Sequence, residues 1–143
     1  MTAAVLLSIC GRQTYMDQEP DVIEFTTEGR LHKIDGGWKI EYTETALTGM
    51  EGVDTSFTVT PDTMVLTRTG KLNSQMVFKL GQVHESLYQM DFGALLITVC
   101  ATDISWCLNE KGGTVDLKYS IEIEHGASGA VDYHMDIKPI SDF

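Results

Sequence analysis

The stretch that decides the fold is TVDLKYSIEIE, residues 114–124. Apolar and polar side chains alternate through it, so that one face is almost wholly apolar and the other carries Thr, Asp, Lys, Ser and Glu. Alternation of this length indicates a half-buried antiparallel strand, with one face on a core and the other in water. The expected inner face consists of Val115, Leu117, Tyr119, Ile121 and Ile123.

The residues that follow repeat this pattern after a turn. HGASGA, residues 125–130, is rich in turn formers, and VDYHMDI, residues 131–137, alternates again. In this second segment Val131, Tyr133, Met135 and Ile137 are expected to point inward. Two alternating segments joined by a turn predict a β-hairpin.

Upstream, turn signals recur roughly every eight to twelve residues, as in all-β sandwiches and barrels. The period of two breaks down in ISWCLNEKGG, residues 104–113, which is the best candidate for a helical turn. The strands expected between the turns are DVIEFTTEG (21–29), RLHKIDGG (30–37), WKIEYTET (38–45), TSFTVTPD (55–62), TMVLTRTG (63–70), SQMVFKLG (74–81), HESLYQMDFG (84–93) and ALLITVCATDISW (94–106).

No linker or low-complexity stretch divides the chain, so residues 1–143 are expected to form one domain of about ten strands. An open sheet of that size would expose costly edges, which closure removes. We therefore favour an antiparallel, closed or nearly closed β-barrel over a β-sandwich.

The apolar stretch near the start, AAVLLSICGRQ (3–13), has two interpretations. It is either an export signal that ends at a lipid-modified Cys10, or the first strand of the domain. No Lys or Arg precedes the apolar run, and Ile9 is too bulky for an ordinary cleavage site. Val5, Leu7 and Ile9 share one face at a period of two, which favours the strand.

The net charge and the cysteine content indicate which classes of partner and which cell compartment to expect. Acidic residues outnumber basic ones 21 to 10, for a net charge of −11, which disfavours nucleic acid and anionic membranes as partners. The three cysteines, Cys10, Cys100 and Cys107, are an odd number without a CxxC pair. This usage is typical of a reducing compartment, so we expect a cytoplasmic protein.

Six short motifs follow one another along the chain: VIEFTTEGRLHK (22–33), YTETALTG (42–49), LTRTG (66–70), QMVF (75–78), FGAL (92–95) and GTVDLKYSIEI (113–123). Together they resemble the YwiB-like proteins, which are small bacterial proteins of unknown function. The resemblance implies a lipocalin-like (calycin-like) antiparallel β-barrel. It implies no enzymatic activity, ligand or catalytic residue.

Two charged residues, Glu44 and Arg68, occupy positions that continue apolar alternations. Strand ends at a barrel rim would expose both. If both point inward instead, each needs a partner, because a lone buried charge costs several kcal/mol. In that case we expect Glu44 and Arg68 to pair inside the barrel or at its mouth, with Tyr42 or Tyr88 nearby.

An inward Arg68 would suit the acid group of a small amphipathic or anionic ligand, since guanidinium binds carboxylates in a fork geometry. Small barrels hold such ligands with few polar contacts. The alternative is a filled interior. Small residues opposite Arg68 favour the ligand, and large residues that fill the barrel favour the alternative. The expected wall residues are Met76, Phe78, Tyr119, Tyr133 and Met135.

No motif for metal, cofactor or nucleophilic catalysis is present in the sequence. HExxH, HxH and GxSxG are absent, and Glu41 and Glu44 would face opposite sides of a strand. We therefore expect a non-enzymatic protein without metal or cofactor. Its role is either to bind a small ligand or, alternatively, to contact another protein or a second copy of itself through its outer sheet.

Overall fold

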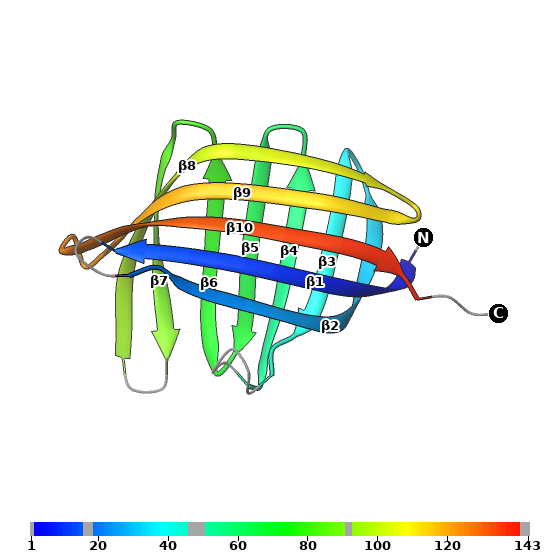
Figure 1. Ribbon diagram of the computed structural model, residues 1–143. Coiled ribbons are helices and arrows are strands. Elements are labelled where there is room, and N and C mark those ends of the chain that lie inside the picture. Colours follow the sequence, from blue (N-terminus) through cyan, green and yellow to red (C-terminus); the bar gives the residue numbers. More distant parts are fainter. Residues whose placement is uncertain (1, 16–18, 46–50, 91–92, 141–143) are drawn as a thin grey trace.

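The computed structural model describes residues 2–15, 19–45, 51–90 and 93–140. Ten antiparallel strands close into a barrel in which each strand pairs with its neighbours in sequence and β1 pairs with β10 (Figure 1). The predicted all-β barrel of about ten strands is confirmed. The strands are β1 (Thr2–Tyr15), β2 (Asp21–Ile34), β3 (Gly37–Thr43), β4 (Val53–Thr60), β5 (Thr63–Gly70), β6 (Leu72–Lys79), β7 (Val83–Met90), β8 (Gly93–Asn109), β9 (Gly112–Ile123) and β10 (Ala127–Pro139).

The barrel is flattened into two layers. In Figure 1, β1, β2, β9 and β10 run across the view, while β3 to β7 run nearly perpendicular to them behind. The long strands β2 and β8 join the layers, because β2 pairs with both β1 and β3, and β8 pairs with both β7 and β9. Side chains from the two layers meet in a single core.

The two segments that open and close the chain follow the expected alternation. In β1, Val5, Leu7 and Ile9 are buried, which confirms the strand. The predicted hairpin is formed by β9 and β10, but its turn is shorter than expected and spans Glu124–Gly126. Glu124 and His125 adopt left-handed backbone angles there, with φ of 54° and 58°.

Two expected boundaries are wrong. We expected one strand to end at Gly29 and a second to start at residue 30, but β2 runs through both segments. Gly29 is a point of close approach, because a Cβ on it would lie 2.5 Å from the carbonyl oxygen of Glu41. Glycine therefore permits packing here and does not end the strand.

The expected helical turn at residues 104–113 is also wrong, since β8 continues to Asn109. The register with β9 shifts between Ala101 and Asp103, which marks a β-bulge. A bulge inserts one extra residue and so moves the inward positions from odd to even numbers. Trp106 consequently points inward, where its Nε1 donates a hydrogen bond of 2.9 Å to the carbonyl of Thr60.

Much of the interior is filled by large apolar side chains. The aromatic rings of the two layers pack on each other, with 4.7 Å between the centroids of Phe78 and Tyr119 and 5.2 Å between those of Phe57 and Tyr133. Among the described residues no helix could cross a membrane. The largest side chains that are fully buried are Phe57, Phe78, Leu7, Leu31, Ile40, Met64, Met76, Leu117 and Met135.

Candidate functional site

A row of polar side chains crosses the inner face of β3 to β6. Direct register pairs join Tyr42 to Thr55, Thr55 to Arg68, and Arg68 to Ser74. Each of these residues stands two positions from a buried apolar residue of its own strand, and alternation therefore turns it inward. We call these four residues the polar row. They place a cation, two hydroxyls and a phenol side by side inside the barrel.

Glu44 lies beside the polar row. Its backbone N–H donates to the carbonyl of Val53 at 2.8 Å, which carries the β3–β4 pairing beyond the end of β3. The side chain is only 3% exposed, and Thr55 Oγ1 donates a hydrogen bond of 2.5 Å to its Oε2. The structure thus places Glu44 inside the barrel and not on an exposed rim.

Arg68 is half-buried on the inner face of β5. Its Nη1 donates a hydrogen bond of 2.9 Å to the hydroxyl of Tyr88 on β7. Burial acts to lower the pKa of Arg68, but Tyr88, Tyr42 and Glu44 outweigh burial, and the pKa is raised. Arg68 and Glu44 therefore lie within electrostatic range, with both expected tyrosines around them.

Three buried tyrosines extend this polar region across the barrel. Burial is the main cause that raises the pKa of Tyr42, and the Glu44 carboxylate adds to the shift. Burial is also the main cause that raises the pKa of Tyr119, and the nearby Tyr88 adds to the shift. The pKa of Tyr133 is raised by burial and then by the nearby Tyr42. All three phenols are therefore protonated at neutral pH, and those of Tyr42 and Tyr133 interact with each other and with Glu44.

Two buried polar atoms in this region, Arg68 Nε and Ser74 Oγ, have no hydrogen-bond partner within the described residues. The phenol of Tyr133 interacts with that of Tyr42. Ser74 as a whole is only 8% exposed. A buried polar group without a partner costs about 1–3 kcal/mol, and native proteins therefore rarely leave such groups unpaired. Two such donors on paired residues favour an acceptor from outside the chain.

The expected wall residues divide into two groups. Met76, Phe78 and Met135 are fully buried in the apolar core. Tyr119 and Tyr133 pack with their rings on that core, while their hydroxyls face the polar region. Large side chains thus fill the interior away from Arg68. The residue paired with Arg68 on β6 is the small Ser74.

A hollow of about 510 Å³ opens beside Ser74. It lies between β6 and β7, and we call it the β6–β7 slot. Its walls are Asn73–Gln75 of β6, His84–Leu87 and Gln89 of β7, and Leu96 of β8.

A larger hollow, of about 710 Å³, lies over β2 to β5 and is lined mainly by outward residues, together with Tyr42 and Thr55 of the polar row. Charged residues of both signs line it, and several already pair with one another. Glu41 contacts both His32 and Lys39, and Thr43 donates a hydrogen bond of 2.9 Å to Asp54. Because these polar groups have partners, this hollow is the weaker candidate for a binding site.

Sequence reasoning missed Thr55, Ser74 and Ser86. Thr55 lies between the inward residues Val53 and Phe57, and Ser74 lies between Leu72 and Met76. Their signal was therefore present, as hydroxyls at apolar positions of an alternation. Small hydroxyl residues are common in strands, and such a signal is weaker than that of Glu44 or Arg68.

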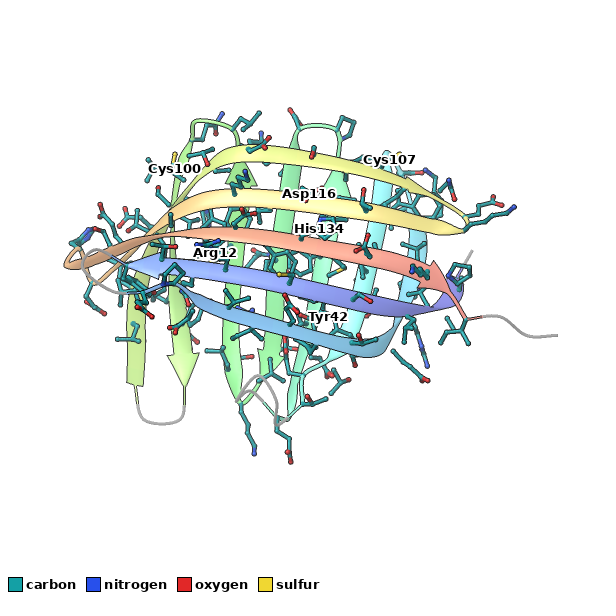
Figure 2. The ribbon with its side chains drawn as sticks, viewed as in Figure 1. Arg12, Tyr42, Cys100, Cys107, Asp116 and His134 are labelled. Atoms are coloured by element: carbon teal, nitrogen blue, oxygen red, sulfur yellow. The ribbon has the colours of Figure 1, made fainter. Side chains whose placement is uncertain are left out.

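On the outer face, His134 of β10 lies between two carboxylates. Its Nδ1 is 2.6 Å from Asp116 Oδ1 and its Nε2 is 3.1 Å from Asp136 Oδ2. Figure 2 shows His134 and Asp116 on the adjacent strands β10 and β9. Within the described residues, no three His, Cys, Asp or Glu side chains are arranged to hold a metal ion.

The closed ten-strand barrel and a family profile together define the class of protein. Residues 7–137 match a domain of unknown function, DUF1934, and the chain belongs to this family. Among solved structures, the crystal structure of the ywiB protein from Bacillus subtilis is similar to it. The TM-score is 0.82 at 21% identity, over 94% of this chain and 92% of that chain, which supports the same fold. A search of curated proteins finds no match.

Proposed function

We propose that this barrel binds a small amphipathic molecule through its acid group, in a lipocalin-like manner and without catalysis. The observation that carries the proposal is the group of buried donors around Arg68. Arg68 Nε and Ser74 Oγ have no partner within the described residues, and Tyr88 orients the guanidinium. Charge-assisted hydrogen bonds from such donors are the usual means of holding a carboxylate.

The Glu44 carboxylate limits which ligands fit. It lies within electrostatic range of Arg68 and is held by Thr55. A ligand acid group therefore approaches a guanidinium that is already partly neutralised. This favours a ligand with a single acid group and an apolar body over a multiply charged anion.

The proposal is tested with dansylated undecanoic acid and its uncharged methyl ester, both followed by fluorescence. We expect the acid to bind more tightly than the ester. Arg68→Met should weaken binding of the acid by about tenfold or more, because a hydrogen bond to a charged group contributes about 1.5–3 kcal/mol. The ester should bind the wild type and Arg68→Met with equal affinity.

The matched control is Arg30→Met, since Arg30 is exposed on the outer face of β2. Tyr88→Phe keeps the charge of Arg68 and removes only the acceptor at 2.9 Å, so it should cause a smaller loss and remain folded. Native mass spectrometry of protein purified from its host gives an independent search for a bound ligand. Equal binding of acid and ester, unaffected by Arg68→Met, would exclude this function.

A second candidate is contact with another protein or with a second copy of this chain. The observation that favours it is the exposure of apolar residues on the outer surface, among them Leu6 of β1 and Val22 of β2. Sedimentation of the wild type and of Val22→Glu distinguishes the two functions. A dimer that dissociates in the variant supports contact through this surface.

We also propose a cytoplasmic location in a bacterial cell. Free cysteines support it, because Cys10, Cys100 and Cys107 are all unpaired in the structure. Unpaired thiols are typical of a reducing compartment. Fractionation of the host cell tests this proposal, and recovery of the protein in an extracytoplasmic fraction would contradict it.

A further inference from the structure

The wall of the barrel is incomplete between β6 and β7. The ladder between the two strands consists of two pairs only, Leu72 with Met90 and Asn73 with Gln89. Beyond them, Ser74–Lys79 and Val83–Tyr88 pair only with β5 and β8 on their far sides. The backbone N–H and C=O groups that these two segments turn toward each other therefore lack ladder partners.

The opening is closed at both ends. The two ladder pairs close one end. At the other end the connection between the strands is fixed to β8, because Leu80 bridges to Ala101 and Gly81 N–H donates to the Ala101 carbonyl at 3.1 Å. The unpaired stretch of the two strands is therefore bounded at both ends, and the 510 Å³ slot lies along it.

The inner part of the slot is polar and reaches the polar row. Ser74 and Ser86 both line the slot, and the hydroxyl of each is buried without a partner within the described residues. Ser74 pairs in register with Arg68. An acid group that enters the slot would thus meet two hydroxyls first and then the guanidinium.

The outer part of the slot is of mixed polarity. Leu87 lines it, is 48% exposed and pairs with Leu96, which lines it as well, while Asn73, Gln75, Glu85 and Gln89 are its polar residues. Val83, which is 68% exposed, lies on the same face of β7 as Leu87, and the exposed Leu80 precedes it in the connection from β6. Exposed apolar side chains gathered at one opening typically mark a binding site.

We propose that the β6–β7 slot is the entrance and the outer half of the ligand site. The acid group passes inward to Ser74 and Arg68, while the apolar chain of the ligand lies over Leu87, Leu96 and Val83. This inference rests on the proposed function and adds the route and the ligand class, a single-chain amphipathic acid. The two unpartnered hydroxyls of Ser74 and Ser86 in the slot, with the apolar Leu87 and Leu96 beside them, carry it.

The test places a bulky residue over the slot. Gln75 is exposed, lines the slot and faces outward, so Gln75→Trp should narrow the entrance without entering the core. We expect association of dansylated undecanoic acid, measured by stopped flow, to slow by about tenfold or more, because access to the site controls this rate. Thr67→Trp is the matched control, since Thr67 pairs with Gln75 and lies one strand farther from the slot.

Leu87→Trp is a second variant at the opposite rim of the slot, with the same expected slowing. If both slot variants bind the acid at the wild-type rate while Arg68→Met still weakens binding, the slot is not the entrance and the proposed function stands. If the wild type does not discriminate acid from ester, the proposed function fails, and this inference fails with it. If the two slot variants slow association and Thr67→Trp does not, the result supports both the proposed function and the slot as the entrance.

Discussion

Two hairpins of the same barrel differ sharply in how they are paired. The β9–β10 hairpin pairs along its length, from Ala127 with Ile123 to Ile137 with Gly113. The β6–β7 hairpin is joined by an equally short connection but pairs at two positions only. β6 alternates apolar and polar residues, whereas β7 turns His84, Ser86 and Tyr88 toward the interior and exposes Val83 and Leu87. The direction in which side chains point therefore does not determine how far two neighbouring strands pair.

The difference also separates two roles within one fold. The β9–β10 hairpin presents an apolar inner face, including Leu117 and Met135, which closes the core. The β6–β7 hairpin presents Ser74, Ser86 and Tyr88 to the interior around a slot. The well-paired hairpin contributes stability, and the open one provides the candidate site.

The largest expected effect is in amide hydrogen exchange. Alternate amides of Ser74–Lys79 and Val83–Tyr88 face the slot and should exchange at least about a thousandfold faster than the paired amides of β9 and β10, because exchange without global unfolding requires an unpaired group. NMR-detected exchange at single residues measures this. Amides of β6 that bond to β5 are the internal control. Uniform protection throughout β6 and β7 would show that the slot is closed in solution.

The second-largest expected effect is a difference in stability between variants of two leucines. Leu117 of β9 is 1% exposed, whereas Leu87 of β7 is about half exposed. Leu117→Ala should lower the free energy of unfolding by about 2–5 kcal/mol, since it leaves a cavity in the core. Leu87→Ala should lower it by less than about 1 kcal/mol. Urea unfolding followed by fluorescence measures both, and equal losses would mean that the β6–β7 hairpin is packed as tightly as β9–β10.

The same contrast explains how far the sequence predicts the fold. The alternation of Val115, Leu117 and Tyr119 requires a strand with one buried face, and the structure agrees. The end of β8 was missed because a single bulge near Thr102 moves the inward residues from odd to even positions, so that a continuous strand resembles a break. Gly29 was misassigned as a strand end because close packing and chain reversal both select glycine.

The candidate site was predictable in part. Glu44 and Arg68 stand out because charged residues are rare at inward positions, and the structure places Glu44 next to Thr55 and Arg68 next to Tyr88, with Tyr42 near both. The slot has a weaker signal. β6 alternates as an ordinary strand does, but β7 turns polar residues inward, and nothing in its sequence shows that the β6–β7 connection is fixed at Ala101.

The smallest expected effect lies on the outer face of the well-paired hairpin. Hydrogen bonds to Asp116 raise the pKa of His134, burial opposes them, and Asp136 adds a further increase. Since the folded-state pKa exceeds the unfolded value of about 6.5, the contribution of His134 to stability is complete below that pH. It is lost as the pH rises through the folded-state pKa.

His134→Gln should therefore reduce the free energy of unfolding at about pH 5.5 and have less effect at about pH 8.5. The pH-dependent part should stay under about 1 kcal/mol, because the side chain is 39% exposed and exposed ion pairs contribute little. Urea unfolding midpoints of the wild type and of His134→Gln at the two pH values measure this effect. Subtracting one protein's midpoint from the other's removes the contribution of titratable groups that both proteins contain. A loss that is equal at both pH values would mean that His134 contributes packing across β9 and β10 and not charge. The pairing of this hairpin would then rest on its backbone ladder and inner face alone.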